Sequence, residues 1–178
     1  WGDDVVANRK GGGLFYYDSD ASTEPTRATS VTTSPVSTNS IIVSPNDRHL
    51  ICLGTNRFEA TATVSGAFDP MLVRWSDQDD RNEWNPTAAT DAGEVVLTDG
   101  TRIVGAVRAR NAINIWTDNA LWLMQFVGGN FVFKFQQVGT NCGLIGQHAA
   151  IDYNGTTYWM GYDNFYIYSG AVQILDCT

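Results

Sequence analysis

The chain has 178 residues, of which 43% are apolar, 12% aromatic and only 17% charged, a composition that supports a hydrophobic core and excludes wholesale disorder. Eleven basic and nineteen acidic residues give a net charge of −8, which disfavours general nucleic-acid binding because that affinity comes from Lys and Arg at phosphates. No run approaches the roughly 20 apolar residues of a membrane-spanning helix, and three cysteines without a CxxC spacing predict neither a zinc site nor a disulfide framework.

The first predicted element is a hairpin, residues 5–8 and 14–18, turned by three consecutive glycines at 11–13. It represents a partial blade over residues 1–18. Residues 19–40 differ in kind, because they are rich in Ser and Thr, include two prolines and carry almost nothing large and apolar. We expect this segment to be an extended strap on the surface.

Residues 41–97 contain the next four strand candidates, with a long insertion among them. A turn at Pro45-Asn46-Asp47 joins the first two, and turn residues of this kind are typical of hairpins. The four candidate strands are residues 41–44, 49–54, 71–76 and 95–97.

The clearest signal lies in residues 102–138 and 149–175, where short apolar runs alternate with two-residue turns. Asp118-Asn119, Gly128-Gly129 and Asn154-Gly155 are pairs that tolerate the positive φ of tight hairpins. Each segment therefore predicts four antiparallel strands. The predicted strands are residues 103–108, 112–117, 120–127 and 131–138, then 149–153, 157–161, 165–168 and 171–175.

Four-stranded antiparallel units that recur every 40 to 50 residues or so are typical of β-propeller blades. The sequence predicts an all-β, propeller-like region over 1–178 that forms a partial ring, with a β-sandwich as the alternative. Because a closed propeller has about four to eight blades, and because the chain opens at Trp1 without a Met, we expect a fragment of a longer chain. No segment has the 3.6-residue periodicity of a long helix.

The acidic loop, residues 75–84, is the strongest candidate for a polar site. Its carboxylates could hold Ca²⁺, although the alternation of an EF-hand loop is broken at Arg81 and its turn glycine is absent. The loop is also similar to the Asp-box of sialidase-type propellers without matching it. We favour a surface turn in which Ser76 and Asp77 bond to backbone amides while Trp75 and Trp84 pack below. The candidate metal ligands are Asp77, Asp79, Asp80 and Glu83.

Nothing in the sequence predicts catalysis or a cofactor. Glycosidases need paired carboxylates, whereas Asp118, Asp152 and Asp163 sit in or beside predicted turns. His49 and His148 lie in no nucleophile elbow or metal spacing. The period-2 placement of the aromatic residues favours a core between blades over a sugar-stacking platform. The tryptophans predicted to have structural or interface roles are Trp75, Trp84, Trp116, Trp122 and Trp159.

Several strings over most of the chain, outside residues 19–40 and 55–68, resemble virion proteins of tailed phages. The resemblance is to the tail tubular B, or nozzle, family of short-tailed bacteriophages and to their head-closing stabilisation relatives. The strings are Arg74-Trp75-Ser76-Asp77-Gln78-Asp79 with Trp84, Arg102-Ile103-Val104, Ile115-Trp116-Thr117-Asp118, Gly139-Thr140-Asn141, Tyr158-Trp159-Met160-Gly161, and the opening Trp1-Gly2-Asp3-Asp4-Val5-Val6-Ala7-Asn8 with Gly12-Gly13.

That resemblance implies a propeller-bearing structural subunit, several copies of which form a ring around the DNA exit channel beside other tail or adaptor proteins. It implies a virion location after synthesis in the bacterial cytoplasm, transient passage of DNA, and no membrane anchor. Nozzle proteins are much longer than this chain. The alternative function is a carbohydrate-binding or sialidase-like glycan-processing propeller, carried by the acidic loop and by surface Trp and Tyr.

Overall fold

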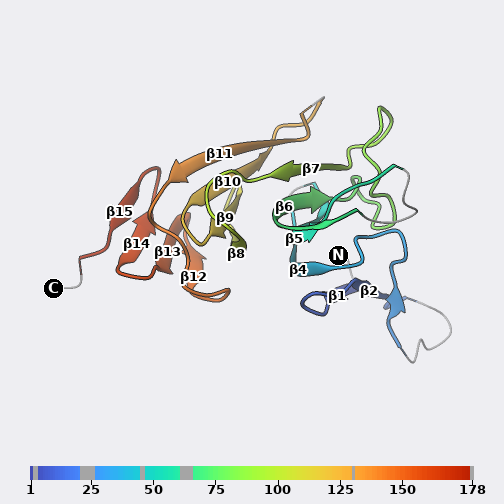
Figure 1. Ribbon diagram of the computed structural model, residues 1–178, viewed down its shortest axis with the longest axis horizontal. Helices are drawn as coiled ribbons and strands as arrows, with labels where there is room; N and C mark the ends of the chain where they lie inside the picture. Colours follow the sequence, from blue (N-terminus) through green and yellow to red (C-terminus); the bar gives the residue numbers. More distant parts are fainter. Residues whose placement is uncertain (2–3, 21–26, 45–46, 61–65, 130, 177–178) are drawn as a thin grey trace. The chain divides into compact units, whose positions relative to one another are not determined.

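The protein is all-β in the computed structural model, which describes residues 1, 4–20, 27–44, 47–60, 66–129 and 131–176. These residues form fifteen strands in four antiparallel sheets (Figure 1). The described residues form no α-helix, so they include none that could cross a membrane.

Each sheet is a meander in which consecutive strands are neighbours, as in a propeller blade. The first has three strands, β1 (Val5–Asn8), β2 (Leu14–Tyr17) and β3 (Thr29–Ser30). The second has four, β4 (Thr38–Val43), β5 (Leu50–Asn56), β6 (Phe68–Trp75) and β7 (Gly93–Val96). The third comprises β8 (Ile103–Arg108), β9 (Ile113–Thr117), β10 (Leu121–Phe126) and β11 (Phe133–Gly139). The fourth comprises β12 (Ala150–Tyr153), β13 (Thr156–Met160), β14 (Phe165–Tyr168) and β15 (Val172–Ile174).

These bounds confirm the predicted strands to within a few residues, and the reason is turn chemistry. Asn154 and Gly155 have φ of 53° and 81°, as a two-residue type I′ hairpin requires. The turn at Asp118 does not use positive φ. There the Thr117 hydroxyl oxygen accepts the backbone N–H groups of Asn119 and Ala120, at 3.1 and 2.8 Å.

The prediction of a surface strap over 19–40 is wrong for its second half. Residues 21–26 of that segment lie outside the described residues. Residues 45–46 of the predicted turn at 45–47 lie outside them too. Thr29–Ser30 is a strand paired with β2, so the first sheet extends beyond residue 18. Val31 is 6% exposed, and its N–H donates to the Leu14 carbonyl at 2.9 Å. The Ser34 hydroxyl, also buried, donates to the Val31 carbonyl. Small residues with internal hydrogen bonds thus enter the core without an apolar pattern in the sequence.

The chain divides into two compact units, Trp1–Val96 and Leu97–Thr178, and each contains two sheets. In the first unit, a buried cluster links β2 and β5 with the loop after β6. It consists of Leu14, Val31, Leu50, Cys52 and Trp84. A single propeller-like region over 1–178 requires the two units to stack on each other, and this stays a prediction.

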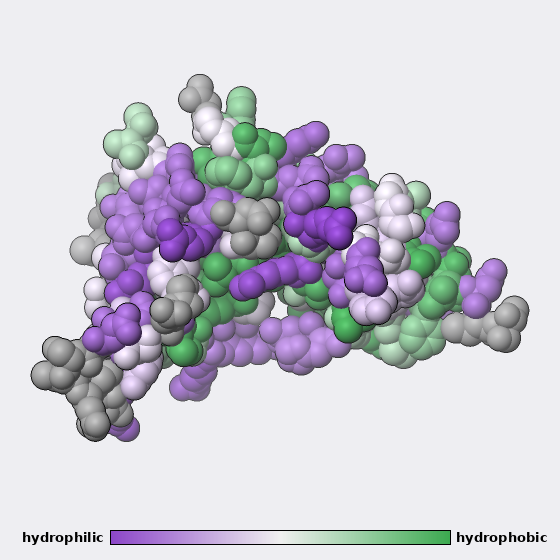
Figure 2. Space-filling view, turned by 180° about the vertical axis from the view of Figure 1, so that it is seen from behind, coloured by the Kyte–Doolittle hydropathy of each residue, from purple (hydrophilic) through white to green (hydrophobic). Residues whose placement is uncertain are grey.

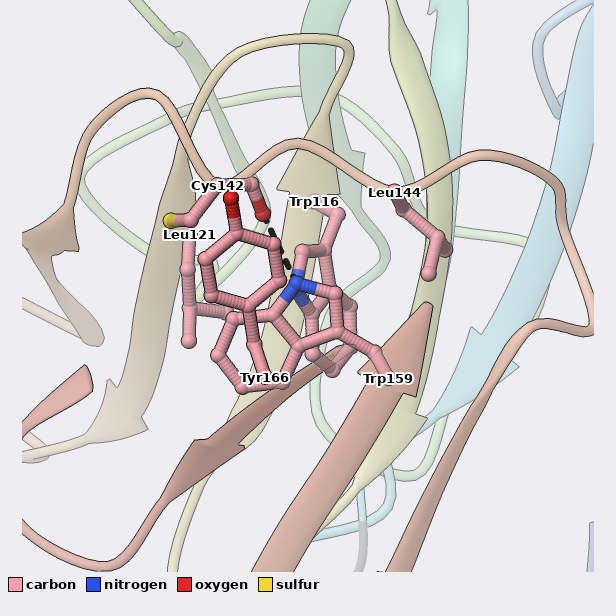
Figure 3. Packing of buried hydrophobic residues seen from close by; sticks show 6 residues of the cluster. All are labelled: Trp116, Leu121, Cys142, Leu144, Trp159 and Tyr166. Atoms are coloured by element: carbon pink, nitrogen blue, oxygen red, sulfur yellow. Dashed lines mark hydrogen bonds between the residues drawn. The ribbon is translucent and has the colours of Figure 1, made fainter. Parts of the chain in front are cut away.

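The second unit has an aromatic core between its two sheets. Trp116 and Leu121 come from the third sheet, Trp159 and Tyr166 from the fourth. The Trp159 ring stacks on Tyr166 at 5.3 Å and tilts against Trp116 at 5.5 Å between ring centroids. The segment that connects β11 to β12 adds Cys142 and Leu144 to the same cluster (Figure 3). Buried aromatic area of this kind dominates core energetics.

Candidate functional site

The acidic loop between β6 and β7 uses its carboxylates within its own turns. Asp77 Oδ1 accepts the N–H groups of Gln78 and Asp91, at 2.9 and 2.7 Å. Asp80 accepts the N–H of Asn82 and Glu83 that of Asn85, at 2.8 and 2.7 Å. These are the short side-chain-to-backbone bonds that Asp and Glu form in turns.

Asp79, the fourth candidate ligand, is paired with Arg48. The guanidinium approaches both carboxylate oxygens, Nε to Oδ1 at 2.6 Å and Nη2 to Oδ2 at 2.7 Å. Both side chains are about half exposed, so this pair contributes little to stability. Among the described residues no group of three His, Cys, Asp or Glu side chains could hold a metal ion, and the four acids serve turns and an ion pair instead.

The two tryptophans of the loop lie beneath it rather than on its surface. Trp75 and Trp84 are 6% and 1% exposed. Their indole N–H groups donate to the carbonyls of Asp91 and Arg81, each at 2.8 Å. The Arg81 guanidinium in turn lies 3.3 Å from the centre of the Tyr16 ring in β2. The contact between Arg81 and Tyr16 ties the loop to β2. Because both indoles are buried, neither is available for stacking on a sugar.

A buried arginine in β6 was not anticipated from the sequence. Arg74 is 1% exposed, and its guanidinium donates to the carbonyls of Asn56 and Trp84, at 3.3 and 3.0 Å. Burial lowers the pKa of Arg74, and the nearby carboxylate of Glu94 acts in the opposite direction. The side chain ties the end of β5 to the acidic loop. Its signal in the sequence is weak, because the acceptors are main-chain carbonyls that no residue pattern identifies.

Asp47, His49 and Ser76 gather in the core of the first unit but do not form a nucleophilic triad. All three are buried. His49 Nδ1 lies 2.8 Å from the main-chain carbonyl of Ser76, and its Nε2 lies 4.0 Å from Asp47 Oδ2. The Ser76 hydroxyl accepts the Leu50 N–H and donates to the Asp77 carbonyl. A nucleophile needs its hydroxyl at the base and open to substrate, so this cluster is structural.

The acids predicted to belong to turns in the second unit also brace the fold. Asp118 Oδ1 accepts the Thr101 N–H at 2.7 Å. Asp152 accepts the Thr157 hydroxyl at 2.8 Å and the Gly155 N–H at 3.3 Å. The same Thr157 hydroxyl accepts a hydrogen bond from the Asn114 amide at 2.7 Å, which joins β13 to β9 across the two sheets. These hydrogen bonds fix turns within the third and fourth sheets, and the one between Asn114 and Thr157 links the two sheets.

The predicted structural tryptophans of the second unit differ in their surroundings. Trp116 and Trp159 are buried between the sheets. Trp122 is half-buried, and its side chain lies on the other face of the third sheet, because successive residues of a strand point to opposite faces. Trp159 Nε1 donates to the Cys142 carbonyl at 2.7 Å (Figure 3).

The fourth sheet leaves one face uncovered, and that face is apolar. Its inner face carries Trp159 and Tyr166, whereas its outer face exposes large side chains across β12, β13 and β14. A shallow groove of about 240 Å³ crosses one end of this face, smaller than the roughly 300–1,000 Å³ of small-molecule pockets. Figure 2 shows hydrophobic surface at this end of the second unit, near the C-terminal residues. The exposed residues are Ile151 (62%), Tyr153 (68%), Met160 (42%), Phe165 (46%) and Leu175 (39%).

The first sheet leaves a similar face uncovered in its own unit. Leu14 faces the core, but Val5, Phe15 and Tyr17 are 57%, 42% and 38% exposed. The register pairs Val5 with Tyr17 and Ala7 with Phe15, so the exposed side chains share one face.

No model of a known protein family matches this chain, and no curated protein matches it either. The resemblance to phage nozzle proteins therefore stays a prediction based on the strings quoted above.

Proposed function

We propose that the chain is a non-enzymatic structural subunit of a bacteriophage tail, part of a nozzle or head-to-tail closure. In this proposal several copies form a ring around the DNA exit channel, in contact with neighbouring tail or adaptor proteins. The chain is made in the host cytoplasm and ends up in the virion. The observation that supports this role best is that each unit leaves an apolar sheet face uncovered, which suits assembly rather than chemistry.

The use of polar groups supports the same role. The carboxylates of the acidic loop are engaged in turns or with Arg48, and the buried Ser76 and His49 contact main-chain atoms. A net charge of −8 also fits a conduit, because an acidic wall repels the phosphates of the passing duplex and does not retain it.

The carbohydrate-binding alternative was carried by the acidic loop and by surface Trp and Tyr. Trp75 and Trp84 are buried beneath that loop and offer it no stacking surface, whereas Tyr153 and Tyr162 are exposed. A glycan array with the wild type and the Asp79→Ala variant tests it directly. We expect no specific binding by either protein.

The proposed function is tested on particles of the phage whose genome encodes the chain. Antibodies against the purified chain, coupled to gold, are expected to label the tail of intact particles in electron micrographs. Purified particles should also contain the chain in several copies per virion by quantitative mass spectrometry. Its absence from particles, with the chain recovered only from the soluble lysate, would refute the proposal.

A further inference from the structure

We propose that the hairpin formed by β10 and β11 inserts its tip into the surface of an anionic lipid bilayer. The hairpin tip comprises residues 126–129 and 131–133. The contact is peripheral, because the tip reaches only the headgroups and the adjoining part of the acyl chains. This inference goes beyond the proposed function, since it gives the second unit a binding surface of its own, and it does not depend on ring formation.

Large apolar side chains are exposed on the hairpin tip. Phe126, Val127 and Phe131 are 42%, 52% and 80% exposed. They lie at the ends of β10 and β11, whereas the sheets of a propeller stack through their faces. Stacking of a further sheet would therefore leave the hairpin tip open, and its partner has to come from beyond the strand ends.

The register shows that the hairpin tip protrudes from its sheet. Met124 is the last residue of β10 that pairs with β9, where it lies opposite Ile113. β10 and β11 continue together as far as the pair Phe126 and Phe133 before the chain turns (Figure 1). This continuation adds about 7 Å before the turn itself is counted. Its reach is comparable to the roughly 5–10 Å by which interfacial segments enter a bilayer.

The base of the hairpin tip satisfies its main-chain donors internally. The N–H groups of Val127 and Gly128 both donate to the carbonyl of Val132, at 3.0 and 3.3 Å. The rings of Phe126 and Phe133 meet edge to face, with 5.7 Å between their centroids. Because an apolar medium offers main-chain groups no hydrogen-bond partner, a segment that enters one has to arrive with such bonds already formed.

Three basic side chains, called here the basic group, lie at the same end of the third sheet and are set back from the hairpin tip. Arg108 ends β8 and pairs with Ile113, and Lys134 pairs with Gln125 beside the tip. Arg110 follows in the turn between β8 and β9. All three are exposed, and none forms an ion pair with a described residue.

The third sheet keeps its acidic residues away from the basic group. Residues 103–117 and 119–151 contain no Asp or Glu. Asp118 follows the other end of β9, and Asp163 lines the same polar hollow as Asp118. One acid of the fourth sheet, Asp152, lies toward the basic group, but its carboxylate is engaged within the β12–β13 hairpin. The end that carries the hairpin tip is therefore locally positive on a chain whose net charge is −8.

An anionic bilayer complements both features of this end. Lipid phosphates attract Lys and Arg at the surface, and acyl chains take up the apolar side chains that protrude beyond them. A nucleic acid would also attract the basic group, but it binds such a surface by stacking its bases on aromatic rings. The aliphatic Val127 between the exposed phenylalanines suits acyl chains instead.

The test measures flotation of the whole chain with lipid vesicles. We expect binding to vesicles made of equal parts phosphatidylglycerol and phosphatidylcholine, weaker binding as salt is raised, and none to phosphatidylcholine alone. Phe131→Ser should weaken binding at least about tenfold, because it removes a buried phenyl group from the contact. The double variant Arg108→Gln and Arg110→Gln should weaken it about 25-fold, at about fivefold for each charge. These positions are exposed, so the variants should fold, which far-UV circular dichroism checks.

Matched controls lie on the same unit but away from the hairpin tip. Arg102→Gln removes an exposed charge at the opposite end of β8, and Ile174→Ser removes an apolar side chain that is 56% exposed in β15. Both should bind like the wild type. A wild type that does not bind, equal binding to the two kinds of vesicle, or equal losses in controls and test variants would each overturn the proposal.

A probe on the hairpin tip reports insertion directly. Phe131→Cys in a Cys177→Ser background, labelled with a fluorophore sensitive to its surroundings, should shift to shorter wavelength on anionic vesicles and be quenched by lipids with a quencher on the acyl chain. Unchanged emission would refute insertion. Tighter binding of DNA than of vesicles, lost with Arg108→Gln and Arg110→Gln but kept with Phe131→Ser, would assign this end to nucleic acid instead. None of these outcomes affects the labelling of phage tails, so the two proposals are tested separately.

Discussion

Replacing Trp159 tests whether the aromatic core holds the two sheets of the second unit together. The side chain is 2% exposed, stacks on Tyr166, contacts Trp116, and donates to the Cys142 carbonyl. Trp159→Ala removes the ring and leaves a cavity, for which the expected cost is about 3–5 kcal/mol. Trp159→Phe keeps aromatic packing but removes the N–H donor and leaves a buried carbonyl unpaired, for which about 1–3 kcal/mol is expected.

Native-state hydrogen exchange is the assay of choice, because it reports the stability of β9 and β13 without a contribution from the first unit. A loss of 3–5 kcal/mol corresponds to a fall in protection of between about a hundredfold and several thousandfold. Trp122→Phe is the control. Trp122 is half-buried, and its Nε1 has no acceptor among the described residues, so this change should cost less than about 1 kcal/mol. Equal losses for Trp122→Phe and Trp159→Phe would refute the role assigned to the Trp159 hydrogen bond.

Three further predictions concern the buried Arg74, the hydrogen-bonded carboxylate of Asp99 and the thiols of Cys52 and Cys142. Arg74→Met should destabilise the first unit by about 2–4 kcal/mol in urea unfolding, because the carbonyls of Asn56 and Trp84 lose their donor; an unchanged midpoint and slope would contradict this. The hydrogen bond from the Asn119 amide, followed by those from Thr140 and Gln137, lowers the pKa of Asp99. Stability from Asp99 is therefore present above its unfolded pKa of about 3.9 and is lost as the pH falls through the lower folded pKa; thermal melts of Asp99→Asn should show a weaker dependence on pH below about 4 than those of the wild type. Burial raises the pKa of Cys52 to about 12 and raises that of Cys142, so in a Cys177→Ser background iodoacetamide at pH 8 should label neither thiol until urea is added; rapid labelling of the folded protein would contradict the burial.

The sequence predicts the strands well where turn residues and alternation agree. The pairs Gly128-Gly129 and Asn154-Gly155 locate their hairpins because their backbones adopt positive φ. Sequence analysis misses β3, because Thr29–Ser30 is too short and too polar to show a strand pattern. The pairing of β3 with β2 is set by the tertiary fold.

The sites are harder to predict than the strands, because a residue type does not determine its partners. The acidic loop looks like a possible cation site in the sequence, but its carboxylates meet amides that only the folded loop brings near. The burial of Arg74 depends on main-chain carbonyls at the end of β5 and in the acidic loop. The sequence does identify the aromatic strands, and the register then shows which side chains of the fourth sheet face the core and which lie on its outer face.

The segment that connects β11 to β12 has a consequence for how such chains diversify. Cys142 and Leu144 lie inside the aromatic core, and a methyl group on Gly143 would lie 2.1 Å from the Asp118 carbonyl oxygen. The connector is thus shaped by both sheets that it joins. A recombination event that exchanged the last sheet for one from another protein would succeed only when it carried this stretch along, so the inheritable module is the sheet together with the residues that precede it.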